Sequence, residues 1–254
     1  MSRVVFGAHP VREAVKSGCK GLQALWCVEP RSASLDELVD AAARCGTRVQ
    51  PATRAQLDEL CRSTSHQGIA AVVGDYEYRD LEDLLEPTGS TPLLLVVDSV
   101  TDPQNLGAMI RSAVVLGATG LVLPKDRCVG ITSTVVRVSS GATEYLPSAR
   151  VTNLPRALKQ LKSARLWIVG TVERDGCAPR EVAWQEPTAV VLGSEQRGIR
   201  PLVLRQCDLR VTIPTPGPIA ALNVAAATAI VLYEAARQRG RGVSGSTQPR
   251  TPPL

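Results

Sequence analysis

Four polar side chains in three separate loops could carry chemistry in this chain: Asn105, Arg111, Glu195 and Asn223. They provide two amides, a guanidinium and a carboxylate, and the loops add no histidine and no cysteine pair with metal-ligand spacing. Such a set excludes most hydrolytic chemistries. It suits a group transfer in which the substrates bring their own reactivity and the protein supplies position.

The first loop, 98–111, follows the apolar run LLLVVD and leads into a helix. Asp102 is suited to cap that helix, and Pro103 fits its first position. Asn105 therefore stands near the positive end of the helix, where it offers both a donor and an acceptor.

Arg111 lies on the apolar side of the same helix. Gly107 and Ala108, four and three residues before it, are expected to leave room beside the guanidinium for another backbone or a nucleotide. A capped helix with an arginine that snorkels to solvent explains the same residues on composition alone.

The second loop, 190–198, runs from a strand into Gly193, and Glu195 and Gly198 follow. Glycine permits a close approach of the backbone to a ligand. The sequence has neither G-x-G-x-x-G nor G-K-[ST] here, which argues against a dinucleotide-dependent dehydrogenase and against a P-loop. A plain turn between strand and helix is the alternative.

The third loop begins where a strand ends at Ile213 and Pro214, and it leads through Pro and Gly residues to a helix rich in alanine. Asn223 is the polar residue at the start of that helix, and a buried polar group there must find partners. The alanine face suits close packing in a core or a dimer. An ordinary buried helix with a local asparagine hydrogen bond is the alternative.

The bulk composition narrows the class of protein. The chain has 254 residues, 44% of them hydrophobic, which is enough for one large core or two small ones. Its net charge of +5 favours a polyanionic partner only weakly. Aromatic residues make up 3%, so an RNA partner would be held by shape and phosphate contacts rather than by base stacking.

The seven cysteines and two histidines predict no metal site, because no cysteine pair has CxxC spacing. An odd cysteine count without a secretion signal leads us to expect reduced thiols and a cytoplasmic protein. No apolar run approaches the ~20 residues of a membrane span, so no membrane contact is expected.

Alternating helix and strand patterns divide the chain into two α/β units. Residues 1–78 form a small first domain, and residues 79–92 turn acidic and then rich in Pro, Gly, Ser and Thr, as in a linker. Residues 93–238 alternate near-continuous apolar strands with helices, which predicts a parallel sheet covered on both faces. Residues 239–254 are expected to be a disordered tail.

Two local expectations follow from this division. Ser34 should cap a helix of the first domain, with Glu37 three residues later as its capping-box partner. Loops at the carboxyl ends of parallel strands are where such folds bind ligands, so the three polar loops should meet at one edge of the second sheet.

The same loops resemble the three motifs of the SpoU, or TrmH-like, RNA ribose 2′-O-methyltransferases. The motifs are D-x-x-x-D-P-x-N-x-G-x-x-x-R-x-A at 98–113, L-G-x-E-x-x-G at 192–198, and I-P followed by L-N-V within 213–224. The first unit resembles the L30e-like substrate-binding domain of that family, with G-x-H-P-V at 7–11 and H-Q-G-I at 66–69. The chain most resembles the group that methylates guanosine in large-subunit ribosomal RNA.

The resemblance implies a SPOUT methyltransferase domain with a deep trefoil knot, although knots are among the rarest topologies. It also implies S-adenosylmethionine as methyl donor and a homodimer that meets at the knotted domain through the last helix. The residues that it places at the cofactor are Thr171, Gly193, Glu195, Ile213, Pro214, Leu222 and Asn223.

The resemblance places Arg111 towards the ribose 2′-hydroxyl, in its own chain or across the dimer interface. The guanidinium would assist deprotonation of the hydroxyl, or hold the target phosphate and stabilise developing alkoxide charge, and both roles stay open. Asn105, Glu195 and Asn223 would arrange the site.

One departure from the family pattern bears on activity. Serine usually stands before and after L-N-V, and this chain has Ala221 and Ala225. The loss of a positioned hydrogen bond would weaken catalysis, at a cost of ~1–3 kcal/mol, or it would mark a homologue that binds RNA without methylating it. A transfer RNA methyltransferase and a ribosome-modifying antibiotic-resistance enzyme are further alternatives.

Overall fold

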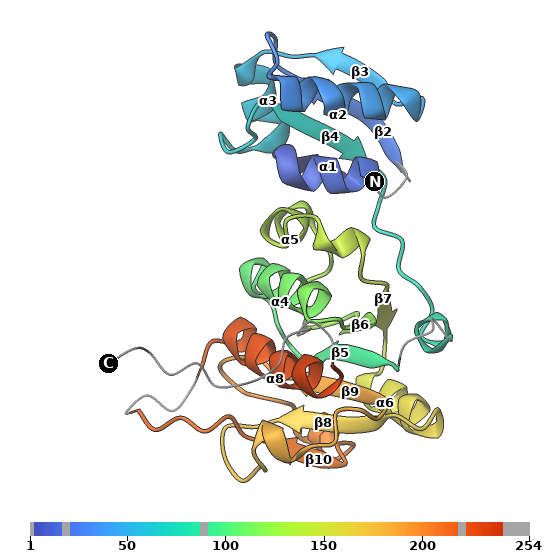
Figure 1. Cartoon of the computed structure of the whole chain (residues 1–254), viewed down its shortest axis with the longest axis vertical. Coiled ribbons are helices and arrows are strands. Elements are labelled where there is room, and N and C mark those ends of the chain that lie inside the picture. Colours follow the sequence, from blue (N-terminus) through green and yellow to red (C-terminus); the bar gives the residue numbers. More distant parts are fainter. Residues whose placement is uncertain (1–2, 17–20, 87–90, 218–221, 241–254) are drawn as a thin grey trace.

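The computed structural model describes residues 3–16, 21–86, 91–217 and 222–240. Two α/β domains stack end to end, with the first domain at the top of Figure 1. The first holds a mixed sheet of four strands and the second a parallel sheet of six. The α/β class and the parallel sheet expected from the sequence are confirmed.

The first domain is built on a sheet with strand order β1-β4-β2-β3. Strand β2 runs parallel to β3, and β4 runs antiparallel to both β1 and β2. Its elements are β1 (Arg3–Phe6), α1 (Ala8–Lys16), β2 (Leu22–Cys27), α2 (Ala33–Arg44), β3 (Arg48–Pro51), α3 (Arg54–Cys61) and β4 (Ile69–Val73).

The expected cap of α2 is wrong by two residues. Helix α2 begins at Ala33, and its N-cap is Ser32, whose backbone is extended with φ −78° and ψ 156°. Ser34 lies inside the first turn, where a helical residue cannot take the capping position. Helix α3 shows the full capping box: Thr53 Oγ1 accepts from the Gln56 backbone N–H at 3.2 Å, and the Gln56 side chain accepts from the Thr53 N–H at 2.8 Å.

The second domain is built on a sheet with strand order β10-β8-β9-β5-β6-β7. Every strand pair in it is parallel, and helices or short 3₁₀ turns (η) connect the strands. Its strands are β5 (Leu93–Val97), β6 (Gly120–Pro124), β7 (Ser148–Val151), β8 (Trp167–Thr171), β9 (Thr188–Leu192) and β10 (Leu209–Val211). Its helices are α4 (Pro103–Val115), α5 (Ser133–Val138), α6 (Leu154–Ser163), α7 (Pro201–Leu204) and α8 (Val224–Gln238), with η2 (Ala142–Glu144) and η3 (Pro179–Glu181).

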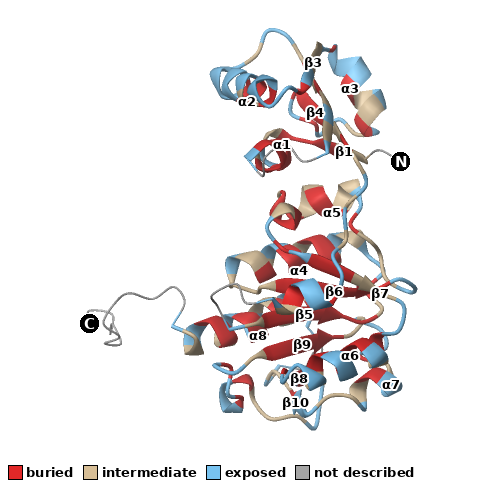
Figure 2. Cartoon of the chain, turned by 90° about the vertical axis from the view of Figure 1, so that its right-hand side faces the viewer, coloured by how far each residue is buried: buried red, intermediate tan, exposed pale blue. Residues whose placement is uncertain are grey.

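Both faces of this sheet are covered, as the continuous apolar strands predicted. Successive side chains of a strand point to opposite faces, and β5 is buried along its whole length. Leu93, Leu95 and Val97 belong to the core under α4, α5 and α8, whereas Leu94 and Val96 belong to the core under α6 and α7. Figure 2 shows the buried strands β5, β6 and β9 between these layers.

The segment expected to be a linker is partly packed. It contains the short 3₁₀ helix η1 (Glu82–Leu85), and Leu81 and Leu84 are buried in the core under α6. The expected tail is also partly packed. Its first residue, Arg239, donates hydrogen bonds to the carbonyls of Thr91, Pro92, Trp184 and Glu186. Residues 241–254 lie outside the described part of the chain, and the predicted knot stays a prediction.

The two domains touch through several elements. Helix α5 packs against β1, and α1 packs against η2. Tyr145 donates a hydrogen bond to the Glu13 carboxylate across this boundary, and Tyr76 donates to Ser148 Oγ at 3.1 Å. Gly141 allows the close approach, because a Cβ there would lie 2.7 Å from the Glu13 Cβ.

Candidate functional site at the carboxyl edge of the parallel sheet

Neighbouring strands bring the three polar loops to one edge of the second sheet. Strands β5 and β9 pair in parallel from Leu93 opposite Thr188 to Val97 opposite Leu192. Both strands therefore end together, and the Asp98 N–H continues the ladder by donating to the Leu192 carbonyl at 2.8 Å. Strand β10, which precedes the third loop, pairs in parallel with β8, and β8 pairs in parallel with β9, so the loops after β5, β9 and β10 open on the same edge.

Three of the four expected catalytic residues form one hydrogen-bonded cluster. Asn223 Nδ2 donates to Asn105 Oδ1 at 3.0 Å and also to Glu195 Oε1. The opposite end of the same amide caps α8, because Asn223 Oδ1 accepts from the Ala225 N–H at 2.9 Å. Glu195 Oε1 further accepts from the Val224 N–H at 3.4 Å, which places its negative charge at the positive end of α8.

Arg111 does not join this cluster within a single chain. Its side chain is exposed and forms no hydrogen bond or ion pair with any of the described residues. The room that Gly107 leaves is occupied by another backbone, that of α5, which is one of the two occupants expected from the sequence. A Cβ at Gly107 would lie 2.6 Å from the Val138 side chain and 3.0 Å from the Val135 carbonyl, so this glycine serves the packing of α4 on α5.

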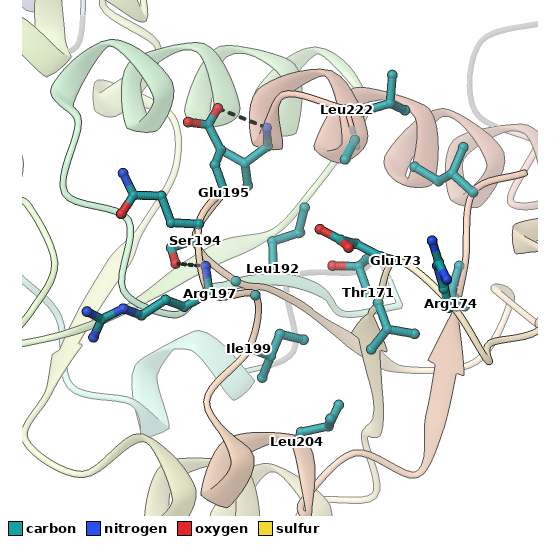
Figure 3. A pocket seen from close by; sticks show the side chains of 18 of the residues that line it. Thr171, Glu173, Arg174, Leu192, Ser194, Glu195, Arg197, Ile199, Leu204 and Leu222 are labelled. Carbon is teal, nitrogen blue, oxygen red and sulfur yellow. Dashed lines mark hydrogen bonds between the residues drawn. The ribbon is translucent and has the colours of Figure 1, made fainter. Parts of the chain in front are cut away.

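A pocket of about 440 Å³ opens beside the cluster, within the ~300–1,000 Å³ typical of small-molecule sites. Figure 3 shows Thr171 and Glu173 pointing into it from the β8 side, Leu222 on one wall and Ile199 with Leu204 on the opposite wall.

Gly193 shapes the floor of this pocket. A Cβ at this position would lie 2.1 Å from the Gly198 carbonyl carbon and 2.2 Å from the Ile199 nitrogen, so no other residue fits without moving the backbone. The loop is closed by the Ser194 and Gly198 backbones, which bond each other in both directions at 3.2 and 2.8 Å. The strand-end glycine is thus needed for a close approach of backbone to backbone.

The structure places the other expected cofactor residues as follows. Thr171, Glu195, Ile213 and Leu222 line the pocket, and Thr171 Oγ1 donates to the Val191 carbonyl at 3.0 Å. Pro214 is exposed and is not among the lining residues, and Asn223 lies next to the pocket between two residues that line it. Ala221 lies outside the described residues.

A second, adjoining cleft of about 570 Å³, which we call the outer cleft, shares the 194–198 loop with the pocket. Its walls carry Asn105 and Glu195 from the cluster together with Arg127 and Arg197. The outer cleft thus presents cationic side chains next to the amide–carboxylate cluster, as a binding surface for a polyanion requires.

One structural pair at the site was missed from the sequence. The Asp98 carboxylate is fully buried and accepts from Arg200 Nε at 2.7 Å and from the Arg200 N–H at 2.8 Å. This ion pair ties the end of the 194–198 loop to the end of β5. The two residues are 102 positions apart, so no local pattern could have linked them, although both lie within or beside recognised motifs.

Two partly buried thiols of the second domain, Cys128 and Cys207, are poor nucleophiles. Burial raises the pKa of Cys128 to about 12 and that of Cys207 to about 11, and a thiol must ionise to attack or to bind metal. Within the described ranges no group of three His, Cys, Asp or Glu side chains is arranged to hold a metal ion. No helix in the same ranges is long and apolar enough to cross a membrane.

The chain belongs to the SpoU rRNA methylase family. Residues 92–233 match that family, and residues 4–79 match the family described as RNA 2′-O ribose methyltransferase substrate binding. The resemblance expected from the three motifs is confirmed.

Individual relatives narrow the comparison. The "23S rRNA (guanosine-2'-O-)-methyltransferase RlmB" of Shewanella oneidensis is 40% identical over 240 residues, which cover 93% of this chain and 97% of that protein. An "Uncharacterized tRNA/rRNA methyltransferase" of Synechocystis is 41% identical, and this chain spans 63% of its length. Among solved structures, the SpoU methyltransferase AviRb of Streptomyces viridochromogenes in complex with the cofactor AdoMet has a TM-score of 0.82 and 28% identity, covering 95% of this chain and 92% of that one.

Proposed function

We propose that this chain transfers a methyl group from S-adenosylmethionine to the ribose 2′-hydroxyl of a guanosine in large-subunit ribosomal RNA. The observation that carries the proposal is the convergence of Asn105, Glu195 and Asn223 beside the Gly193 pocket, in a chain of the SpoU family. The Shewanella relative, which matches over nearly its full length, supports the choice of a ribosomal guanosine.

The pocket fits an adenosine with a charged tail. Its walls combine apolar surface from Leu222 and Ile213 with polar groups from Thr171, Glu173 and Arg174, and Gly193 lets the backbone of the 193–198 loop fold back on itself beside them. When bound, S-adenosylmethionine supplies an electrophilic methyl group on a sulfonium. The relative of known structure binds this same molecule.

The residues around the pocket would orient the ribose and stabilise the negative charge that develops on its 2′-oxygen. Asn223 holds Asn105 and Glu195 in one arrangement, so the amide and carboxylate groups need not reorganise when RNA binds. Arg111 remains without a protein partner among the described residues, which leaves its N–H groups free for substrate. A guanidinium offers five N–H donors and no acceptor, so we assign Arg111 to phosphate binding and to stabilisation of negative charge on the 2′-oxygen.

The active unit is proposed to be a homodimer in the cytoplasm. The outer faces of α8 and α4 expose large apolar side chains: Ile230 is 41% exposed, Tyr233 59% and Val115 76%. Such a patch favours a second protein surface, and a copy of the same chain would build a closed two-fold contact. A partner covering this patch would also shield Arg111 and Asn223, both exposed in one chain.

The proposal is tested by incubating the purified protein with 23S ribosomal RNA, with transfer RNA and with labelled S-adenosylmethionine. We expect base-resistant 2′-O-methyl guanosine in the ribosomal RNA only, and none with Arg111→Ala. Label in transfer RNA would support the alternative substrate. RNA binding without label in either RNA would support the alternative suggested by Ala221 and Ala225, a homologue that binds RNA without methylating it.

A further inference from the structure

A cleft of about 830 Å³ lies between the two domains, apart from the pocket and the outer cleft. Its walls come from β1, the end of α3, the segment after β4, the loop after β6 and strand β7. Its described lining residues include three arginines, Arg3, Arg62 and Arg150, and one carboxylate, Asp75. We infer that this seam cleft binds a phosphate group in the backbone of the substrate RNA, an inference that rests on the proposed function.

Two of these arginines are held in place before any ligand arrives. Arg3 Nε donates to a backbone carbonyl of its own domain at 3.0 Å, and its Cζ lies 5.5 Å from the centre of the Tyr76 ring. Arg150 Nη2 donates to a backbone carbonyl of the second domain at 3.0 Å, and its Cζ lies 5.5 Å from the centre of the Tyr78 ring. Because both guanidinium groups are already ordered, a ligand would meet a smaller entropic cost of binding.

The guanidinium groups still have unused hydrogen-bonding capacity. Arg3 Nη1 and Arg150 Nε are buried without a hydrogen-bond partner in the part of the chain that the structure describes. The tyrosine rings compensate their charge only in part, and burial lowers the pKa of Arg3 against the opposing effects of the Glu144 and Asp75 carboxylates. Because these two nitrogens are covered, an anion in the cleft would meet the remaining N–H groups of each guanidinium fork, whose geometry matches phosphate.

Arg62 adds a third cation at the rim of the cleft. It follows the last residue of α3, and its exposed side chain forms no hydrogen bond or ion pair with the other described residues. A long cationic side chain without a partner can reach a phosphate without breaking an existing contact. The first domain and the second domain would then contribute to the same phosphate site.

The tyrosine rings of the cleft contact the arginines and are not available to stack on a nucleobase. Tyr76 and Tyr78 stand edge to face with ring centres 4.9 Å apart, and each already faces an arginine. Tyr78 Oη also accepts from the Ile131 N–H at 2.8 Å. Rings that are engaged in this way are poor platforms for stacking a base. We therefore expect a contact that positions RNA by its phosphate and reads no sequence.

The seam cleft and the outer cleft are joined by one loop, residues 125–132. Arg127 of this loop lines the outer cleft, whereas Gly130 lines the seam cleft. Between them the Val129 N–H donates to the Val100 carbonyl at 2.9 Å, which fixes the loop to the loop after β5. An RNA strand that enters the outer cleft and continues past Arg127 would reach the seam cleft.

The inference is tested by filter binding of an in vitro transcribed 23S ribosomal RNA to the full chain across a series of salt concentrations. Arg62→Ala should weaken binding about tenfold at low salt and reduce the slope of log affinity against log salt by about 1. Arg150→Lys keeps the charge but loses the fork, so affinity should fall severalfold with the slope unchanged. Arg48→Ala, on the far edge strand β3, is the matched control and should bind as the wild type does.

Calorimetry with S-adenosylmethionine and thermal melting distinguish the proposed phosphate site from the proposed methyltransferase function. Both should be unchanged in Arg62→Ala, because that side chain is exposed and lies outside the methyl-donor pocket. Weaker RNA binding by Arg62→Ala supports the seam site even if no methyl transfer is found. Equal RNA affinity for Arg62→Ala, Arg48→Ala and the wild type, or no RNA binding at all, overturns it even if the enzyme is active.

Discussion

The asparagine at the start of α8 has two tasks that substitution can separate. The carbonyl end of Asn223 caps α8, and its amide end bridges Asn105 and Glu195. Serine keeps a capping oxygen but is too short to bridge, whereas alanine keeps neither. The pair Asn223→Ser and Asn223→Ala therefore distinguishes the contribution of the cap from that of the bridge.

The magnitudes follow from these bonds. Loss of an N-cap oxygen costs about 1 kcal/mol, and two exposed side-chain bonds cost about 0.5 kcal/mol each. Asn223→Ala should lose about 2 kcal/mol and Asn223→Ser about 1 kcal/mol of the free energy of unfolding. At about 2–4 °C per kcal/mol for a domain of this size, Tm should fall by roughly 4–8 °C and 2–4 °C respectively.

Activity should follow a different order. Both variants lose the bridge, so both should lose about 100-fold in kcat for methyl transfer, the cost of a misplaced catalytic group. Asn153→Ala is the matched control: Asn153 caps α6 by accepting from the Arg156 N–H at 3.0 Å and takes no part in the site. It should lower Tm by 2–4 °C, from about 1 kcal/mol, and leave kcat at the wild-type value.

Melting curves and steady-state methylation kinetics with 23S ribosomal RNA distinguish these explanations. Wild-type kcat in Asn223→Ser would refute the assigned role of the bridge. A loss of kcat that simply follows Tm across all three variants, Asn153→Ala included, would show that the asparagine acts through stability alone.

The other predictions concern the guanidinium, the pocket floor and the dimer. Arg111→Ala should lower kcat at least 100-fold without shifting Tm, because the side chain is exposed and unpaired among the described residues; a shifted Tm would point to a structural role instead. Gly193→Ala should abolish S-adenosylmethionine binding in calorimetry, since its Cβ would meet the Gly198 carbonyl carbon at 2.1 Å. Gly198→Ala finds no atom within 4 Å but keeps φ at +61°, so it should lose only about 1–2 kcal/mol and still bind; equal behaviour of the two alanines would contradict the close-approach explanation. The double variant Ile230→Asp with Tyr233→Asp should be monomeric in light scattering and should methylate RNA more slowly than the wild type. An unchanged mass would exclude this face as the dimer interface.

Much of the fold was accessible from local patterns. The near-continuous apolar strands expected within 93–238 are present, and β5, β6 and β9 are buried at every position because both faces of the sheet are covered. Strand β7 was not expected, since Ser148 and Arg150 break its apolar pattern. It is held instead by pairing with β6, in which Leu121 stands opposite Ser148.

The residue types in the three loops indicated the class of chemistry, and the family followed from the resemblance of their motifs to those of known methyltransferases. They also placed the loops at one edge of the sheet, because strand direction follows from the alternation of strands and helices. Only the tertiary structure decided which residues touch: Asn223 contacts Asn105, Asp98 contacts Arg200, and Gly107 faces the backbone of α5. Such contacts join positions far apart in the chain. The periodicity of a sequence shows which neighbouring residues share one face of a helix or strand. It does not show which distant element packs against that face.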